Sequence, residues 1–395
     1  MNDLLLMLIC VCSGVLIVYH HVGYPILLSW YFARHPQQQP VDVIRGYRCS
    51  KKDRKRASVT ILVPAYNEER WIADKIRNLA TLDYPRDKLT VYIACDGCTD
   101  RTVAIAQDTI QEGICDETHF EILDFNKNRG KVAVINDVMS RIQSDITALS
   151  DVSALISVDA LLVAEQHFKK PAVGVVDSYY RLLQSESTAE EAYWYYQHHV
   201  RKKEASLGSA LGAHGAFYLF RTHLFEPLQA STINDDFILP MNIVRKGYRT
   251  HYADDVMSLE METTDQSADF RRRLRISAGN MQQLIQLRSL FLPRYKGVAF
   301  AFLSGKGLRL LTPYLMLLCI ATSALLHDYT LFRTLFFTQL LLFAIAAAGS
   351  LIPRLKNWKP INLITYLIAG HLANLLGGLK YLVGLESGRW TRVNR

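Results

Sequence analysis

The sequence predicts an α/β domain with a Rossmann-like sheet, flanked by transmembrane helices. Between Ser58 and Thr102, short apolar and β-branched runs alternate with amphipathic segments, and an acid follows the second run. Near both ends of the chain lie apolar stretches long enough to cross a bilayer, and the charged residues concentrate between them. The length of 395 residues allows one domain of ordinary size plus additional elements.

The N-terminal apolar stretch is predicted to be a retained transmembrane helix. From Leu4 to Ala33 there is no Asp, Glu, Lys or Arg, and a span needs roughly 20 apolar residues. A cleavable signal peptide is the alternative, but it would begin with positive charge, and Asp3 stands there instead. We therefore expect residues 1–33 to span the membrane, with a kink or an interface change near Pro25.

A basic juxtamembrane linker is predicted over residues 34–57. Its cations are Arg34, Arg45, Arg48, Lys51, Lys52, Arg54, Lys55 and Arg56. By the positive-inside rule this side is cytoplasmic and the N-terminus lies outside. Nucleic-acid binding is the alternative reading of such a run, but its position beside a span favours membrane anchoring, so no nucleic-acid partner is expected.

The first strand of the domain is predicted over Val59–Val63, with Pro64 ending it. Asn67 is expected to cap the following helix, with Glu68 and Glu69 in its positive first turn.

The second strand is predicted over Leu89–Cys95 and runs into Asp96, and Thr99 or Asp100 is expected to cap the next helix. In open parallel sheets ligands bind outside the carboxyl ends of the strands, which places Asp96 at a candidate binding edge.

The segments VPAYNEE (63–69) and CDGCTDRT (95–102), in this order, resemble the nucleotide-sugar-binding start of glycosyltransferase family 2. A generic Rossmann-like unit with a polar edge is the alternative. The resemblance implies a nucleotide-diphosphate-sugar fold of the GT-A type over residues 58–264, with Pro64, Tyr66 and Glu68 beside the donor and Asp96 on its base or ribose. Cys95 and Cys98 form a C-x-x-C that we interpret as incidental, because no second pair accompanies it.

A third strand is predicted over Phe120–Leu123, followed by the loop and helix NKNRGKVAVIN (126–136). Gly130 lets the backbone turn and Lys131 places a cation near a helix start, two features that an anionic ligand can use. Family members carry a similar N-x-G-K segment at the nucleotide edge, although most loop lysines are merely solvated.

A fourth strand is predicted over Ile146–Ser150, and Asp151 follows it directly. The segment SDVSA resembles the metal-binding D-x-D of the family, with Ser153 in place of the second acid. A hard cation bound to a diphosphate needs only one or two protein carboxylates. We therefore expect Mg²⁺ or Mn²⁺ on Asp151, with Ser153 as a weak or water-mediated contact.

Thr188–Leu207 is predicted to be a helix with an aromatic start, for which sugar stacking, core packing and a membrane-facing surface all stay open. The segment GSALGAHGAFYLFR (208–221) is similar to the family segment that precedes the catalytic acid. The resemblance implies that His214 and Gly215 lie on the acceptor side. The alternative for His214 is an ordinary polar loop residue.

A helix is predicted to begin at Asn234-Asp235-Asp236 and to end at Lys246-Gly247. Two adjacent acids at a helix start can serve as capping residues alone. The resemblance aligns them with the Glu-Asp pair of the family, which implies that Asp236 is the general base and Asp235 its supporting acid.

Amphipathic interface helices are predicted over residues 265–305, beginning with a basic helix over Ser267–Leu290. This helix overlaps the Q-x-x-R-W motif of the family, where Arg272 replaces Gln, Arg275 is kept and Ile276 replaces Trp. The resemblance implies that Arg272 and Arg275 hold the diphosphate.

The C-terminal region, residues 306–395, is predicted to contain about three spans, near Leu310–Leu326, Leu335–Ile352 and Ile361–Leu379. The cations Arg354, Lys356 and Lys359 mark the last loop as cytoplasmic, and alternation then puts the C-terminus outside. Arg389, Arg392 and Arg395 instead favour a cytoplasmic C-terminus. A re-entrant or interfacial final segment would reconcile these two placements of the C-terminus.

The resemblance implies an inverting glycosyltransferase. Its donor would be a nucleotide-diphosphate sugar, UDP-linked by preference, and its acceptor a membrane-associated glycan or a lipid-linked molecule. We expect a multi-pass protein of a bacterial inner membrane with a cytoplasmic catalytic domain. It would contact the lipid bilayer and other polysaccharide-assembly proteins, in exopolysaccharide or cell-envelope synthesis.

Three alternatives remain. A processive synthase that also secretes its polymer is one. A non-catalytic membrane partner is another, which the acids Asp96, Asp151 and Asp236 argue against. A transporter would carry a G-x-x-x-x-G-K-[ST] loop, and the sequence has none.

Overall fold

The computed structural model describes residues 3–36, 51–184, 188–262, 266–352, 354–355 and 358–385. The chain forms two compact units. The helical unit comprises Met1–Tyr31 and Gln266–Glu386, and the sheet unit comprises Phe32–Asp265 with Ser387–Arg395. The linker cations Arg45 and Arg48 and the C-terminal arginines lie outside the described residues.

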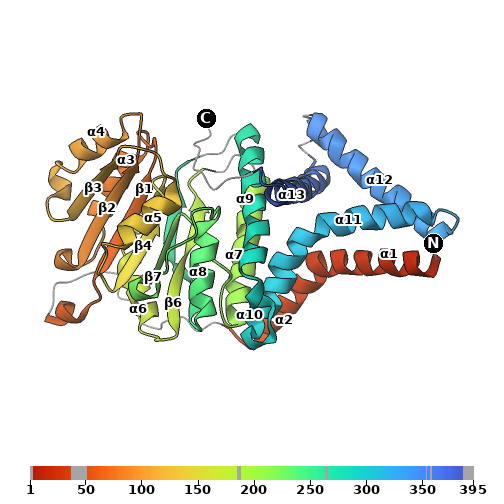
Figure 1. Cartoon of the computed structure of the whole chain (residues 1–395), viewed down its shortest axis with the longest axis horizontal. Helices are drawn as coiled ribbons and strands as arrows, with labels where there is room; N and C mark the ends of the chain where they lie inside the picture. The colour runs from red at the N-terminus through yellow and green to blue at the C-terminus, as the bar shows by residue number, and fades with distance from the viewer. Residues whose placement is uncertain are drawn as a thin grey trace. The chain divides into compact units, whose positions relative to one another are not determined.

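The sheet unit is built on one sheet of eight strands in the order β3-β2-β1-β4-β7-β6-β8-β5 (Figure 1). The strands are β1 (Val59–Ala65), β2 (Leu89–Asp96), β3 (His119–Phe125), β4 (Ile146–Ser150), β5 (Ala154–Ile156), β6 (Val173–Leu182), β7 (Phe217–Arg221) and β8 (Arg249–Glu260). Strands β1 to β4 are mutually parallel, whereas β7 runs antiparallel to both β4 and β6. The sheet is therefore mixed, and its parallel half ends in the loops where the sequence predicts the donor.

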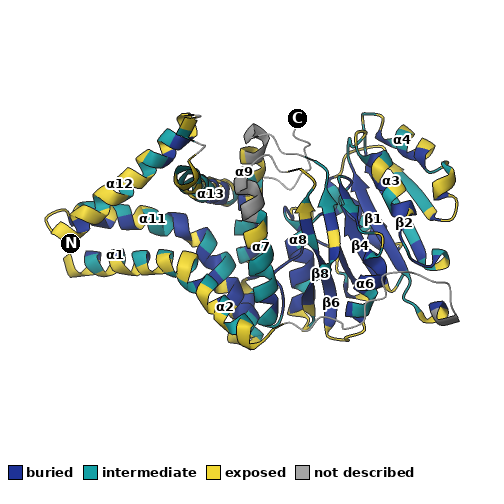
Figure 2. Ribbon diagram, turned by 180° about the vertical axis from the view of Figure 1, so that it is seen from behind, coloured by how far each residue is buried: buried dark blue, intermediate teal, exposed yellow. Residues whose placement is uncertain are grey.

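Six helices connect these strands: α3 (Ile72–Ala80), α4 (Thr102–Thr109), α5 (Lys131–Met139), α6 (Ala160–Phe168), α7 (Thr188–Ser206) and α8 (Asp235–Arg245). The apolar core lies between them and the sheet, and every residue of β1 is buried, as the dark blue strands in Figure 2 show. Strands buried on both faces are continuous apolar runs rather than alternating ones, which is the pattern of Val59–Val63.

Two local predictions at the end of β1 are wrong. Pro64 does not end the strand but lies within it, paired with Ala94. Beyond Leu62, β1 has a strand neighbour only on the β2 side, so the missing N–H of Pro64 can face the side without a partner.

Asn67 does not cap a helix either, because α3 begins five residues later at Ile72. With φ at +54°, Asn67 instead accepts the backbone N–H of Thr99 at 2.8 Å and joins the two loops. At α4, Asp100 accepts the N–H of the first helical residue, Thr102, at 2.9 Å, although Arg101 directly precedes the helix.

The N-terminal apolar stretch is helical but not uniform. Helix α1 (Asp3–Val18) passes through a π-helical turn (Tyr19–Gly23) into α2 (Tyr24–Arg34). The predicted irregularity near Pro25 is thus confirmed. Proline lacks an N–H and its ring crowds the carbonyl four residues earlier, so the turn before it widens.

The helical unit contains the other apolar helices: α11 (Leu308–Leu325), α12 (Thr330–Leu351) and α13 (Lys359–Leu382). Among the described residues, four helical segments are long and apolar enough to cross a membrane: 3–34, 297–325, 330–351 and 359–382. Exposed leucines and Phe337 cover α12, which is largely yellow in Figure 2. An apolar surface of this kind is suited to lipid.

Helix α9 (Gln266–Gln286) packs against α13 within the helical unit. A Cβ atom added at Gly377 of α13 would lie 2.5 Å from the carbonyl oxygen of Leu274, so only glycine permits this approach. Helix α13 continues unbroken through Gly377 and Gly378, and the chain does not turn back within it. Of the two arrangements left open for the final segment, the re-entrant turn is absent from these residues, and the interfacial segment stays a prediction.

Candidate active site

Predicted donor-binding, metal-binding and catalytic residues converge at the ends of three elements of the sheet unit. Lys131 is the first residue of α5, Asp151 follows β4, and Asp235 opens α8. The Nζ atom of Lys131 lies 2.8 Å from Oδ1 of Asp151 and 3.6 Å from Oδ2 of Asp235. One ammonium group therefore joins two acids that are 84 positions apart in the sequence.

Gly215 closes the other side of this acidic cluster, which we define as Asp151, Asp235 and Asp236. A Cβ atom at Gly215 would lie 3.3 Å from Oδ2 of Asp151 and 3.4 Å from Oδ2 of Asp236. The absence of a side chain leaves room beside both carboxylates. The structure thus brings Gly215, predicted from the acceptor segment, to the predicted base.

The charges of the cluster are strongly coupled. Burial alone would favour a neutral Lys131, but Asp151 and Asp235 outweigh burial and raise its pKa, so the ammonium stays charged. Burial, followed by repulsion from Asp235, raises the pKa of Asp236 to about 6, against the opposing effect of Lys131. A carboxylate with this pKa is ionised at neutral pH and remains a competent proton acceptor.

The cluster suits a hard divalent cation. Oδ2 of Asp235 is buried and has no hydrogen-bond partner among the described residues, and the same is true of the Tyr218 hydroxyl. Carboxylate oxygens are ligands that Mg²⁺ and Mn²⁺ prefer, and a bound diphosphate supplies the rest. In the described part of the chain no three His, Cys, Asp or Glu side chains form a complete ligand set. The residues present therefore fit a cation that is shared with a diphosphate.

Ser153 lies on the short segment between β4 and β5, and its carbonyl oxygen accepts the N–H of Met261 at 2.9 Å. This bond fixes the backbone of the segment beside β8. Its predicted weak metal contact stays a prediction.

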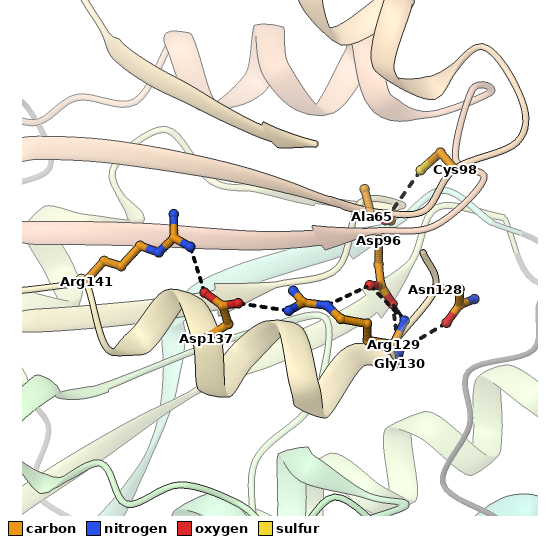
Figure 3. A network of polar contacts seen from close by, with 8 residues as sticks. All are labelled: Ala65, Asp96, Cys98, Asn128, Arg129, Gly130, Asp137 and Arg141. Atoms are coloured by element: carbon orange, nitrogen blue, oxygen red, sulfur yellow. Dashed lines mark hydrogen bonds and ion pairs between the residues drawn. The ribbon is translucent and has the colours of Figure 1, made fainter. Parts of the chain in front are cut away.

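Asp96 is held at the end of β2 by the loop that precedes α5 (Figure 3). Its side chain is fully buried and accepts the backbone N–H groups of Arg129 at 3.0 Å and Gly130 at 2.7 Å. Gly97 is required next to it, because at φ +67° an added Cβ would lie 2.3 Å from the backbone nitrogen of Asn128. Asp96 therefore positions the loop that leads into Lys131, and its predicted contact with the nucleotide stays a prediction.

The other residues predicted to bind the nucleotide-sugar donor lie along the same edge of the sheet. Pro64 is in β1, Tyr66 follows the strand half-buried, and the backbone N–H of Glu68 donates to the Thr102 hydroxyl at 2.7 Å. Arg272 and Arg275 belong to α9 of the helical unit, so their predicted role on the diphosphate stays a prediction.

His214 lies in an aromatic setting. Its ring stacks on Tyr180 with a centroid distance of 3.7 Å, and the Trp194 ring is 5.3 Å away. Its backbone N–H donates to Oδ1 of Asp177 at 2.8 Å. The aromatic start of α7 thus packs, through Trp194, onto the predicted acceptor segment.

Sequence reasoning missed the pair formed by Asp177 and Arg201. Asp177 is fully buried in β6, and the guanidinium group of Arg201 on α7 lies 2.9 Å from its Oδ2. Burial raises the pKa of Asp177 to about 6, although Arg201 opposes this shift. An acid in the apolar run VGVVDSYY was the available signal, because a buried charge requires a partner.

Sequence reasoning also missed Lys75 of α3. Its ammonium group is fully buried and donates to the Ser150 hydroxyl at 2.6 Å and to the carbonyl oxygen of Ala154. The Ser150 hydroxyl in turn donates to the carbonyl oxygen of Ala216 at 2.8 Å. Lys75 thereby fixes both ends of the segment that carries Asp151 and the backbone next to Gly215.

The fold and the site match a known family. The model described as "Glycosyltransferase like family 2" matches residues 56–279, more than half of the chain, so the chain belongs to this family.

Its curated relatives match over parts of their length. A beta-monoglucosyldiacylglycerol synthase from Nostoc sp. is 32% identical over 136 residues, which cover 34% of this chain and 28% of the relative. A poly-beta-1,6-N-acetyl-D-glucosamine synthase from Staphylococcus aureus is 23% identical over 236 residues, 58% of this chain and 56% of the relative. The chain thus spans less than a third of the first relative and just over half of the second.

One solved structure has the same fold over nearly the whole chain. A mannosyltransferase from Pyrobaculum calidifontis, in complex with GDP-Man and Mn²⁺, superposes with a TM-score of 0.68 and 23% identity. The match covers 93% of this chain and 99% of that one. The mixed α/β sheet is therefore of the GT-A type.

Proposed function

We propose that this chain is an inverting glycosyltransferase. It moves a sugar from a nucleotide-diphosphate sugar to a membrane-associated glycan or a lipid-linked acceptor. The observation that carries the proposal is the convergence of Lys131 with Asp151, Asp235 and Asp236 around Gly215. A general base, Asp236, and a charged ammonium group, that of Lys131, lie together, and Gly215 leaves space beside them for the reacting atoms.

The residues account for a single displacement. The acceptor hydroxyl transfers its proton to the Asp236 carboxylate as its oxygen forms a bond to the anomeric carbon. The bond from that carbon to the donor phosphate oxygen breaks, and a nucleoside diphosphate leaves. The ammonium of Lys131 stabilises the charge that develops on the leaving oxygen. Asp235 supports the base by holding Lys131, and Arg272 with Arg275 completes the diphosphate contacts.

A divalent cation fits this scheme. Asp151 would hold Mg²⁺ or Mn²⁺, with Ser153 as an outer contact. Oδ2 of Asp235 lies in the same cluster; it makes no hydrogen bond among the described residues and is 3.6 Å from the Lys131 ammonium. When bound, the cation would neutralise charge on the leaving diphosphate. The mannosyltransferase with Mn²⁺ and GDP-Man supports a metal-assisted donor site of this kind.

The relatives support the choice of acceptor class. One is named for a glycolipid and the other for a polysaccharide, so a glycan or a lipid-linked acceptor covers both. The four apolar helices among the described residues support a multi-pass membrane protein. A bacterial inner membrane and a cytoplasmic catalytic domain are our proposed placement. A UDP-linked donor and an exopolysaccharide or cell-envelope product are our preferred assignments, with other polysaccharide-assembly proteins as partners.

A processive polysaccharide synthase is the second candidate. The match over 236 residues to the poly-N-acetylglucosamine synthase favours it, since that match covers 58% of this chain.

Purified membranes incubated with a panel of nucleotide sugars should release nucleoside diphosphate from one of them. With Asp236→Asn the rate should fall by roughly 10²–10⁴-fold, because an amide cannot accept the proton, while donor binding persists. The matched control is Asp74→Asn, an exposed acid on α3, which should keep the wild-type rate. An Asp236→Asn rate above about a tenth of wild type would reject the assignment of the base.

A further inference from the structure

Cys95 and Cys98 form a pair of thiols at the donor edge of the sheet, and the proposed transfer reaction does not use them. Both are free thiols in the structure. The sequence favoured an incidental pair, because no second C-x-x-C accompanies it and a structural zinc site has about four ligands. A pair of thiols that is oxidised to a disulfide needs no further ligand, so the surroundings of the two sulfur atoms decide what they can do.

Both cysteines lie next to Ala65 at the end of β1. Cys95 is in β2, directly opposite Ala65 in the parallel ladder. The Sγ atom of Cys98 lies 3.6 Å from the carbonyl oxygen of Ala65 (Figure 3). Gly97, between the two cysteines, has a positive φ of +67°. The turn at this glycine therefore returns Cys98 to the strand residue that Cys95 faces.

The two thiols differ in exposure and in acidity. Cys95 is buried, whereas Cys98 is partly exposed. A hydrogen bond from the Cys95 thiol, supported by the backbone of Asn67, lowers the pKa of the Cys98 thiol against the opposing effect of burial. The same bond between the thiols, together with burial, raises the pKa of the Cys95 thiol. An accessible thiol with thiolate character beside a second thiol is the arrangement in which the first is oxidised and the second closes the disulfide.

Cys98 belongs to one of two loops, residues 66–69 and 97–102, that bond to each other at the donor edge. Directly after it, the backbone N–H of Thr99 donates to Oδ1 of Asn67 at 2.8 Å, and the amide group of Asn67 donates to the Thr99 hydroxyl at 3.1 Å. A disulfide brings its two sulfur atoms to about 2.05 Å. Closing it would therefore move Cys98 and, with it, the residue that joins the two loops.

We propose that Cys95 and Cys98 form a reversible disulfide that separates these two loops and weakens binding of the nucleotide-sugar donor. The effect on the donor rests on the proposed function, whereas the chemistry of the thiols does not.

The oxidant is a hydroperoxide such as hydrogen peroxide. The Cys98 thiolate attacks one peroxide oxygen, the O–O bond breaks, the sulfur is oxidised to a sulfenic acid, and hydroxide leaves. The Cys95 sulfur then attacks the sulfenic sulfur. The thiol proton leaves with the hydroxyl group as water, and the S–S bond forms. A dithiol reductant restores both thiols by exchange and becomes a disulfide itself.

The test treats the full chain in detergent with hydrogen peroxide and maps the product by mass spectrometry. Trypsin cuts after Lys88 and Arg101, and the peptide 89–101 contains these two cysteines and no other. We expect this peptide to lose the mass of two hydrogen atoms, to resist alkylation, and to regain both thiols with dithiothreitol. Hydrogen exchange of the Thr99 amide should be faster in the oxidised chain, because its bond to Asn67 is lost.

Binding of UDP and of GDP, each with Mn²⁺, is then measured by titration of the reduced and the oxidised chain. Whichever nucleotide binds the reduced chain should bind the oxidised chain about tenfold more weakly, since two hydrogen bonds between the loops are lost.

Cys98→Ser and Cys95→Ala should each prevent the disulfide and make nucleotide binding insensitive to peroxide, so one variant suffices if the other does not fold. The matched control is Cys12→Ser, which removes an exposed thiol of the helical unit and should respond to peroxide as wild type does.

Four results would each overturn the inference: thiols of peptide 89–101 that stay free, a peptide that gains oxygen atoms instead of forming the disulfide, unchanged amide exchange in the disulfide form, or a nucleotide affinity that oxidation does not change. A reduced chain that binds neither nucleotide would count against the proposed function, while the peptide mass and the amide exchange would still test the disulfide.

Discussion

At the scale of single residues, the ionisation of Asp236 determines the predicted acid limb of the activity. Because burial and Asp235 raise its pKa to about 6, Asp236 is protonated below that pH. It then cannot take the proton from the hydroxyl group of the acceptor. Transfer should therefore fall about tenfold for each pH unit below 6. The measurement is the rate of nucleoside diphosphate release between about pH 4.5 and 8.

Asp177 offers a matched control, because burial raises its pKa to about 6 as well, while its carboxylate is bound to Arg201. Asp177→Asn should lower the rate at every pH and keep the shape of the acid limb. A wild-type rate that stays flat down to pH 5, or an acid limb that Asp177→Asn removes, would contradict Asp236 as the base.

Lys75 is a second residue whose protonation is set by burial. Burial lowers its pKa to about 7, although Asp151 and Glu260 oppose the shift. Between about pH 7 and the unfolded value of 10.5, the unfolded chain binds more protons at this position than the folded one. The free energy of unfolding should therefore rise with pH across this window.

Lys75→Met should remove that rise and also lower stability by roughly 1–3 kcal/mol near neutral pH, because the Ser150 and Ala154 oxygens lose their donor. Chemical unfolding followed by tryptophan fluorescence at pH 7 and pH 10 measures both effects. Lys169→Met, at an exposed lysine, is the control and should keep the wild-type pH dependence. If the free energy of unfolding of Lys75→Met depended on pH as in wild type, the ionisation of Lys75 would not be the cause of the rise.

At the scale of elements, the approach of the segment before β7 to the acidic cluster depends on Gly215. A methyl group there would lie at 3.3–3.4 Å from two carboxylate oxygens, a contact that the acids can relieve only by moving. Gly215→Ala should therefore weaken Mn²⁺-dependent donor binding and lower kcat. The unfolding temperature should stay close to wild type, because Gly215 does not require a positive φ.

Isothermal titration of the donor with and without Mn²⁺, together with the rate, checks this prediction. Gly113→Ala is the control, since a Cβ there meets no atom closer than 3.9 Å. A Gly215→Ala variant with wild-type affinity and rate would show that the carboxylates do not need this space.

At the scale of the whole molecule, the prediction concerns product length. We expect one or a few sugars to be added to each acceptor, because Ile276 stands where the family motif has Trp and offers no aromatic face to a sugar ring. The four candidate spans found in the described part of the chain are also few for a polar conduit whose wall must satisfy every backbone group.

Sizing the products with donor in large excess over acceptor distinguishes the two candidate functions. A ladder of products that stops after one or two additions supports the non-processive transferase. Long polymer formed while most acceptor remains unused would favour the processive synthase instead.

The sequence alone predicted the first four strands of the sheet and the apolar segments near both ends of the chain, whereas β5 to β8 were not predicted. The strands Leu89–Asp96 and Ile146–Ser150 and the helix that begins at Asp235 follow from periodicity and end signals, which act within a few residues. Acids that directly follow parallel strands were likewise readable, because parallel strands end at one edge of the sheet.

Only the tertiary structure decided what these residues contact. The bond of Lys131 to Asp151, the pairing of Asp177 with Arg201 and the burial of Lys75 join elements that are distant in the chain. Pro64 is tolerated within β1 because of where β4 stops pairing, which no local pattern encodes. A buried charge takes its partner from whichever element packs against it, and that choice depends on the three-dimensional arrangement rather than on neighbours in sequence.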